Sequence, residues 1–162
     1  MNVVFMDELV TRYHTNPDKG RRWTLEKPLR VMVDEVEIVV PVGFWTDFAS
    51  IPGFLWVILD PYELGRAPVL HDFLYFTCYR DQQFCDLAFS AGMETEKIAS
   101  WKRWAAYRGV RIGGWKTWER YQVENVKYRL AESAIGANWR RMEISTWDRL
   151  RERHARREQA AA

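Results

Sequence analysis

The residues best suited to catalysis form a short motif near the middle of the chain. His71 and Asp72 are adjacent, and Tyr75 follows His71 by four residues. Because the apolar residues around them recur at helical spacing, His71 and Tyr75 are expected on one face of a helix. Asp86 lies on the next predicted helix, which would return antiparallel past the first. An imidazole beside a carboxylate can act as a general base, so we predict a catalytic group of His71, Asp72, Tyr75 and Asp86.

Oxygen-bearing side chains also occur where the predicted strands give way to helices. Asp47 and Ser50 follow the strongest strand signal, and carboxylate and hydroxyl oxygens are ligands that calcium prefers. Asp47 and Asp72 are therefore candidate ligands of a divalent cation. The alternative is structural, because an Asp at a strand end commonly caps a turn and a His–Tyr pair commonly supports a helix. Both interpretations stay open at this point.

Two other chemistries have less support. Ser50, His71 and an aspartate have the composition of a nucleophilic triad, but the Gly-x-Ser-x-Gly turn that exposes such a serine is missing. Cys78 and Cys85 are expected to be small buried residues rather than a redox pair.

Strands are predicted in the first 45 residues and helices after them. Alternating apolar residues predict strands at 8–14, 22–25, 29–33 and 36–45. Helical spacing predicts helices over 67–79, 82–91, 96–109, 115–134 and 146–159. Asp81 suits the N-cap of the second helix, and Gly92 suits its end. We therefore expect an α+β core over 1–115, with a small antiparallel β-meander packed on helices, and a helical C-terminal extension over 116–162.

The composition excludes several broad classes. The 162 residues are 48% hydrophobic and 28% charged, which indicates a packed core and argues against disorder. No apolar run approaches the roughly 18 residues of a membrane-spanning helix, and no secretory signal is visible. The net charge of +2 argues against extensive coating of nucleic acid.

The nine tryptophans are the unusual feature of the composition. Trp101, Trp104, Trp115 and Trp118 recur at three-residue steps within two pairs. They fit a stacking platform for sugars or bases, a core ridge that packs a helix on the sheet, or a seam between subunits. The arginine-rich tail, interleaved with acids, fits an exposed helix or a docking face. The predicted interface residues are Trp115, Trp118, Trp139, Trp147, Arg149 and Arg153.

Three blocks of sequence, in a fixed order, point to a known family. They are residues 40–52 (VPVGFWTDFASIP), 67–75 (APVLHDFLY) and 85–89 (CDLAF), and Gly113, Gly114 and Trp115 follow them. Over residues 8–118 the chain resembles the domain-of-unknown-function family 1353. Members of that family occur mainly in tailed bacteriophages and in bacterial genomes that carry prophages. The resemblance implies a phage origin, but it implies no reaction.

The His-Asp-x-x-Tyr pattern also looks like the core of secreted and viral phospholipases A2. That similarity implies His71 as the base, Asp72 as a calcium ligand and Asp86 as the group that orients the imidazole. The glycine-rich calcium loop of those enzymes is missing, because residues 50–54 contain one glycine.

Two functions are therefore expected from different classes. The first is a phage-encoded virion component, associated with the tail or the capsid, that docks through its helices and aromatic surface. Its partners would be other phage structural proteins or a second copy of the chain, in the virion or the host cytoplasm, without a specific nucleic-acid motif. The alternative is a small His-Asp hydrolase, with calcium as its candidate cofactor, that acts in lysis, penetration of the host cell or counter-defence.

Overall fold

Two small antiparallel sheets and a layer of helices make up the described part of the chain. The computed structural model describes residues 1–16, 20–48 and 61–124. Within these ranges the first sheet has the strand order β1-β4-β5 and the second has the order β2-β3-β6, so the fold is α+β, as predicted. The strands are β1 (Val3–Phe5), β2 (Thr11–Asn16), β3 (Gly20–Leu25), β4 (Leu29–Val33), β5 (Val36–Val40) and β6 (Trp45–Thr46). A 3-10 turn, η2 (Pro61–Leu64), precedes the helices α1 (Ala67–Phe76), α2 (Gln82–Thr95), α3 (Ser100–Gly113) and α4 (Trp115–Glu124).

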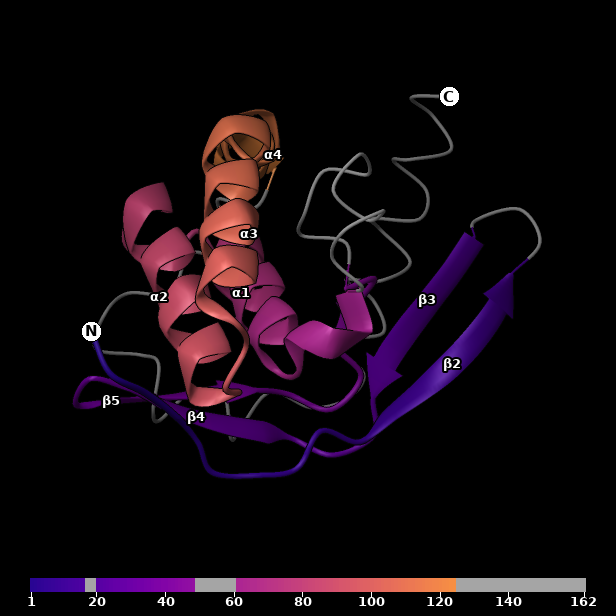
Figure 1. Cartoon of the computed structure of the whole chain (residues 1–162). Helices are drawn as coiled ribbons and strands as arrows, with labels where there is room; N and C mark the ends of the chain where they lie inside the picture. The colour runs from indigo at the N-terminus through magenta and orange to yellow at the C-terminus, as the bar shows by residue number, and fades with distance from the viewer. Residues whose placement is uncertain (17–19, 49–60, 125–162) are drawn as a thin grey trace.

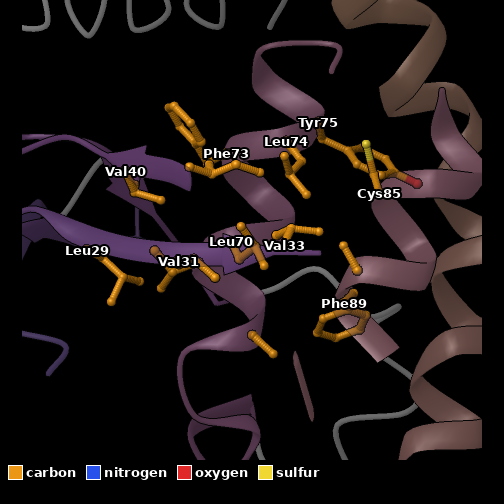
Figure 2. Packing of buried hydrophobic residues seen from close by; sticks show 14 of the residues in the cluster. Leu29, Val31, Val33, Val40, Leu70, Phe73, Leu74, Tyr75, Cys85 and Phe89 are labelled. Carbon is orange, nitrogen blue, oxygen red and sulfur yellow. The ribbon is translucent and has the colours of Figure 1, made fainter. Parts of the chain in front are cut away.

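The first sheet buries one face against the helices. Alternate residues of β4 are buried, because successive side chains of a strand point to opposite faces. Leu29, Val31 and Val33 of this sheet belong to the same buried cluster as Leu70 and Phe73 of α1 (Figure 2). The helices lie above this sheet in Figure 1, and the β2–β3 hairpin extends away to one side. None of the helices in the described ranges is both long and apolar enough to span a bilayer.

The strand predicted over 36–45 is divided between the two sheets. Strand β5 ends at Val40, because Pro41 has no N–H to donate and Gly43 adopts a φ of 80° that favours glycine. The chain then crosses to the second sheet, where the backbone N–H of Leu25 donates to the carbonyl of Phe44 at 3.0 Å. The antiparallel strands predicted as one meander are therefore divided, among the described residues, between two three-stranded sheets. The short strand β1, which pairs with β4, was not predicted.

The helices follow their predicted signals, but several of their ends differ, and α1 ends at Phe76 rather than at residue 79. Pro68 lies in the first turn of α1, and the Asp81 side chain caps α2 by accepting from the N–H of Phe84 at 2.7 Å. However, α2 does not end at Gly92. A Cβ at this position would lie only 3.1 Å from the Cβ of Ala67. That glycine permits close packing of α2 on α1, and the helix continues to Thr95.

The bounds of the third helix also differ from the prediction, and the fourth helix begins where it was predicted. Helix α3 begins at Ser100 rather than Glu96 and reaches Gly113. Helix α4 begins at Trp115, as predicted, and its described part ends at Glu124. The predicted continuation to residue 134 and the helix predicted over 146–159 lie outside the described residues.

Candidate functional site

The polar cluster inside the molecule is built where α1 and α2 run side by side. His71 and Tyr75 lie one turn apart on α1, and Asp86 lies on the second turn of α2. The Asp81 cap fixes where α2 starts, and α2 then packs along α1. Because of this pairing, Asp86 faces both His71 and Tyr75, as the helical spacing predicted.

The cluster is a hydrogen-bonded network centred on the Asp86 carboxylate. The His71 imidazole Nε2 lies 2.9 Å from Asp86 Oδ1, and the Tyr75 hydroxyl donates to the same oxygen at 2.7 Å. Arg111 of α3 donates from Nη1 to Asp86 Oδ2 at 3.0 Å. We call these four residues, His71, Tyr75, Asp86 and Arg111, the buried network. Three separate helices are therefore held together through one carboxylate.

The charges of the buried network balance each other. Asp86 is fully buried, and the guanidinium of Arg111 supplies the compensating positive charge. Burial lowers the pKa of His71, although the hydrogen bond and charge of Asp86 oppose this shift, so the imidazole is favoured in its neutral form. Burial, together with the Asp86 hydrogen bond and charge, raises the pKa of the Tyr75 hydroxyl and keeps it protonated as a donor.

The imidazole and the carboxylate of the network are closed to solvent, whereas the Arg111 side chain is partly exposed. His71 is 3% exposed and Asp86 is 0% exposed. The Tyr75 ring lies 4.2 Å from the imidazole, and the Phe89 ring lies 4.9 Å from it, measured between ring centroids. A base must reach the proton that it removes, to within a hydrogen bond or one water. The geometry of the described residues therefore favours a structural role for His71.

Asp72 points to a different part of the molecule. Adjacent residues on a helix are turned by about 100° from each other, so His71 and Asp72 cannot face the same neighbour. The Thr46 hydroxyl donates to Asp72 Oδ2 at 2.6 Å, and the N–H of Phe48 donates to the Thr46 oxygen at 3.2 Å. Asp72 is thus bonded to the end of β6, away from Asp86. The four predicted catalytic residues do not form a single site.

The candidate metal ligands are only partly brought together. Asp47 is exposed and Asp72 is half-buried, and the charges of both help to raise the pKa of Tyr121 to about 12, after the larger effect of burial. Among residues 1–16, 20–48 and 61–124, no three His, Cys, Asp or Glu side chains gather as a metal centre. Two carboxylates fall short of the six to eight oxygens that calcium takes. The predicted calcium site gains no support from this arrangement, and Ser50 lies outside the described residues.

The tryptophans divide between the core and the surface. Trp118, predicted at an interface, is only 8% exposed and packs edge-on against Tyr75, so it belongs to the core. Trp115 is 48% exposed, and its predicted place in an interface stays a prediction. Trp101 and Trp104 are 54% and 66% exposed, and the interpretation of them as a core ridge is therefore wrong. The remaining predicted interface residues lie outside the described residues: Trp139, Trp147, Arg149 and Arg153.

Two members of the site were not predicted in these roles. Arg111 lies 25 residues from Asp86, and the sequence gives no local signal for such a contact. Gly114 lies between two predicted helices, and a Cβ at this position would lie 2.6 Å from the Tyr75 hydroxyl. Its small size lets the junction of α3 and α4 approach the network. A glycine between two helical patterns was the available signal for this close approach.

The free thiols do not extend the site. Cys78 and Cys85 are both buried, as predicted, and burial raises the pKa of the Cys85 thiol. Cys85 Sγ donates to the carbonyl of Tyr79 at 3.2 Å. Because a thiol is nucleophilic only as its thiolate, this environment disfavours reactivity.

Comparison with known proteins yields a family and no function. A family model described as "Protein of unknown function (DUF1353)" matches residues 23–110, which is more than half of the chain. This range contains β4, β5 and β6, helices α1 and α2, and most of α3. No curated protein and no solved structure matches the chain significantly. The match and the order of its motifs place this chain in the DUF1353 family of proteins of unknown function.

Proposed function

We propose that the chain is a bacteriophage-encoded virion component, associated with the tail or the capsid, that docks onto another protein through the outer face of α3. The observation that carries this proposal is the exposure of three large apolar side chains on one helix. Trp101, Trp104 and Ile112 are 54%, 66% and 70% exposed. Contiguous apolar surface of this kind is rare on isolated soluble proteins and marks interaction sites.

These residues lie along one side of α3. Positions 101, 104, 108 and 112 are separated by three, four and four residues, so they follow each other along the same helix face. We call Trp101, Trp104, Arg108 and Ile112 the α3 stripe. Tryptophan is enriched at the centres of protein interfaces, where each ring removes a large area from water. The stripe therefore has the composition of a protein interface.

The inner face of α3 explains why the stripe faces outward. Ala106, Gly109 and Val110 are buried, and Arg111 is bonded to Asp86 of the buried network. The helix is thus fixed by its small residues and by ion pairs, Arg111–Asp86 among them, which leaves the large aromatics facing outward. Because packing within the described chain does not require these large aromatics, we attribute them to contact with a partner.

The phage assignment rests on the family resemblance and not on the geometry. The blocks at 40–52, 67–75 and 85–89 lie within the range that the family model matches. Proteins of a phage particle assemble through such surfaces, which makes an exposed apolar face useful rather than hazardous. The hydrolase alternative retains the His71–Asp86 contact in its favour, but burial of both side chains argues against it.

Mass spectrometry of particles purified from the phage that encodes this chain tests the proposal. We expect the wild-type chain in the particles, and a loss of at least tenfold for the variant Trp101→Ser/Trp104→Ser. The matched control is Val4→Ser, which removes an apolar side chain that is 45% exposed on β1. Both variants should unfold at the wild-type denaturant concentration. Absence of the wild-type chain from particles, or normal incorporation of the double variant, would contradict the proposal.

A further inference from the structure

We infer that the occupant of the α3 stripe is an amphipathic helix of a different protein, with a carboxylate placed opposite Arg108. This inference rests on the proposed docking function and adds the chemistry of the partner. The stripe runs from Trp101 to Ile112, about 16 Å along the helix axis at 1.5 Å per residue. Spacing of three and four residues is what a second helix needs in order to pack its own side chains between those of the first.

Arg108 determines the charge of the partner. Across Ser100–Gly113, α3 carries four basic residues and no acidic one. Three of the four are paired: Lys102 with Glu63, Arg103 with Glu94, and Arg111 with Asp86.

Arg108 is the exception on this helix. It is exposed, and it forms no ion pair within the part of the chain that the structure describes. It also lies between Trp104 and Ile112, near the middle of the apolar stripe.

A partner that covers the stripe must therefore also cover this charge. Burying a guanidinium without a counter-charge is strongly unfavourable, whereas a carboxylate meets it with two parallel hydrogen bonds. An aspartate or glutamate, flanked by apolar residues on the same helix face, satisfies both requirements of the stripe. This complementarity of shape and charge points to an acidic amphipathic helix.

A second copy of this chain fits less well. Two copies related by a two-fold axis would present the same stripe to each other. An axis through the middle of the stripe, between residues 106 and 107, would bring the two Arg108 side chains to within about one helical turn of each other. Like charges at a desolvated contact oppose association. The α3 stripe is therefore better suited to a partner of opposite charge.

An anionic membrane also fits less well. Electrostatic attachment to lipid generally uses clusters of about four to eight basic side chains. Around the stripe, Lys102 and Arg103 are engaged by Glu63 and Glu94, whose side chains are 54% and 70% exposed. This surface is thus of mixed charge, and it would present few free cations to lipid headgroups.

Two designed peptides test the inference with the full chain. Both are helical peptides with leucines three and four residues apart along one face. They differ only in carrying glutamate or lysine in the middle of that face. Isothermal calorimetry should show the glutamate peptide binding at least tenfold more tightly to the wild type. The variant Arg108→Glu should reverse this preference. The control Lys27→Glu makes the same change of charge at an exposed turn and should leave the preference unaltered.

Four results would overturn the inference. They are equal affinity for the two peptides, no binding of either peptide, a dimer by ultracentrifugation that Trp104→Ser abolishes, and binding to phosphatidylserine vesicles that Trp104→Ser abolishes. Each would leave the proposed docking function intact if the double tryptophan variant is still lost from phage particles. Normal incorporation of that variant would instead remove the docking function itself, so the two failures are distinguishable.

Discussion

The two faces of α3 invert the usual distribution of residue types. On the inner face, small residues make the apolar contacts, and Arg111, at the margin between the two faces, reaches across to the fully buried Asp86. On the outer face, Trp104 and Ile112 are among the most exposed apolar side chains of the described residues. Turning the tryptophans inward would remove more apolar area from water than turning these small residues inward does. A buried polar group and an exposed apolar patch are the informative departures from ordinary burial, and here the helix that carries the patch is also bonded to the buried carboxylate.

The difference between the faces separates stability from function. The buried network connects α1, α2 and α3 through Asp86, so changes to it should alter folding. The α3 stripe contributes little to packing within the described chain, so changes to it should alter binding. This division differs from the expectation of a catalytic centre at His71, because His71, the residue best suited to act as a base, is buried inside the molecule.

The largest effect is expected from Asp86→Ala. The substitution removes the acceptor shared by His71, Tyr75 and Arg111, and leaves their donors without a partner inside the protein. Leaving the buried donors of His71 and Tyr75 unsatisfied costs about 2–6 kcal/mol together, whereas Arg111, whose side chain is 35% exposed, can still reach water. Urea denaturation should show a loss of free energy of unfolding of this size.

The matched control for Asp86→Ala is Glu94→Ala. Glu94 also pairs with an arginine of α3, but its side chain is 70% exposed. Exposed pairs contribute about 0–1 kcal/mol, so this variant should remain close to the wild type. Equal losses for the two variants would show that the buried network is not the stabilising side of the molecule.

A smaller loss is expected from Gly114→Ala. The added Cβ would lie 2.5 Å from the carbonyl oxygen of Val110 and 2.6 Å from the Tyr75 hydroxyl. Forcing extra volume into a packed site typically costs about 1–3 kcal/mol. Thermal unfolding should show a lower midpoint, whereas Gly113→Ala, at the exposed neighbouring position, should show no such loss. An unchanged midpoint for both glycine variants would mean that the α3–α4 junction does not pack closely against the buried network.

The pH dependence of stability tests whether His71 is held neutral. Because burial lowers the pKa of His71 below its ordinary value of 6.5, the unfolded chain takes up a proton at a higher pH than the folded chain does. Stability from this residue is therefore fully present above pH 6.5 and is lost as the pH falls below that value. In His71→Gln the side chain stays neutral throughout, so this part of the pH dependence should disappear.

Urea denaturation of the wild type and His71→Gln at pH 8, 7, 6 and 5 measures the difference directly. The variant should be less stable at pH 8, by about 1–3 kcal/mol for the disturbed hydrogen bond. The gap between the two proteins should narrow as the pH falls below 6.5. Parallel curves would show that the imidazole titrates equally in the folded and unfolded states, and would favour an accessible His71.

The local parts of this arrangement could be predicted from the sequence, and the long-range parts could not. The four-residue spacing of His71 and Tyr75, and the cap at Asp81, are properties of short segments, and they gave the correct partner for Asp86. The rotation between adjacent helical residues also separates Asp72 from His71, which the predicted four-residue site overlooked. Arg111 joins Asp86 through packing of α3 on α2, and no pattern within α3 encodes that contact.

The exposure of the α3 tryptophans could not be predicted from the sequence, for a similar reason. Helix α3 has basic and aromatic residues on neighbouring positions, so its periodicity is compatible with either face turned inward. The deciding factor is that small residues such as Ala106 and Gly109 allow α3 to pack closely on its neighbours. Strand β5 shows the same limit. The sequence pattern predicted that this strand continues to Trp45, but the turn at Gly43 takes the chain to the other sheet, where Trp45 lies in β6.

The smallest effect on stability is expected on the outer face of α3, and the inner face provides its control. Trp104→Ala removes a far larger side chain than Val110→Ala does, but Trp104 is 66% exposed and Val110 is 1% exposed. Surface substitutions usually change stability by less than about 0.5 kcal/mol, whereas deleting buried methyl groups costs more than their transfer energy alone because a cavity remains. Urea denaturation should therefore rank Val110→Ala as the more destabilised variant, although it loses fewer atoms. The opposite ranking would mean that Trp104 packs within the folded chain, and the α3 stripe would then no longer be a free surface for a partner.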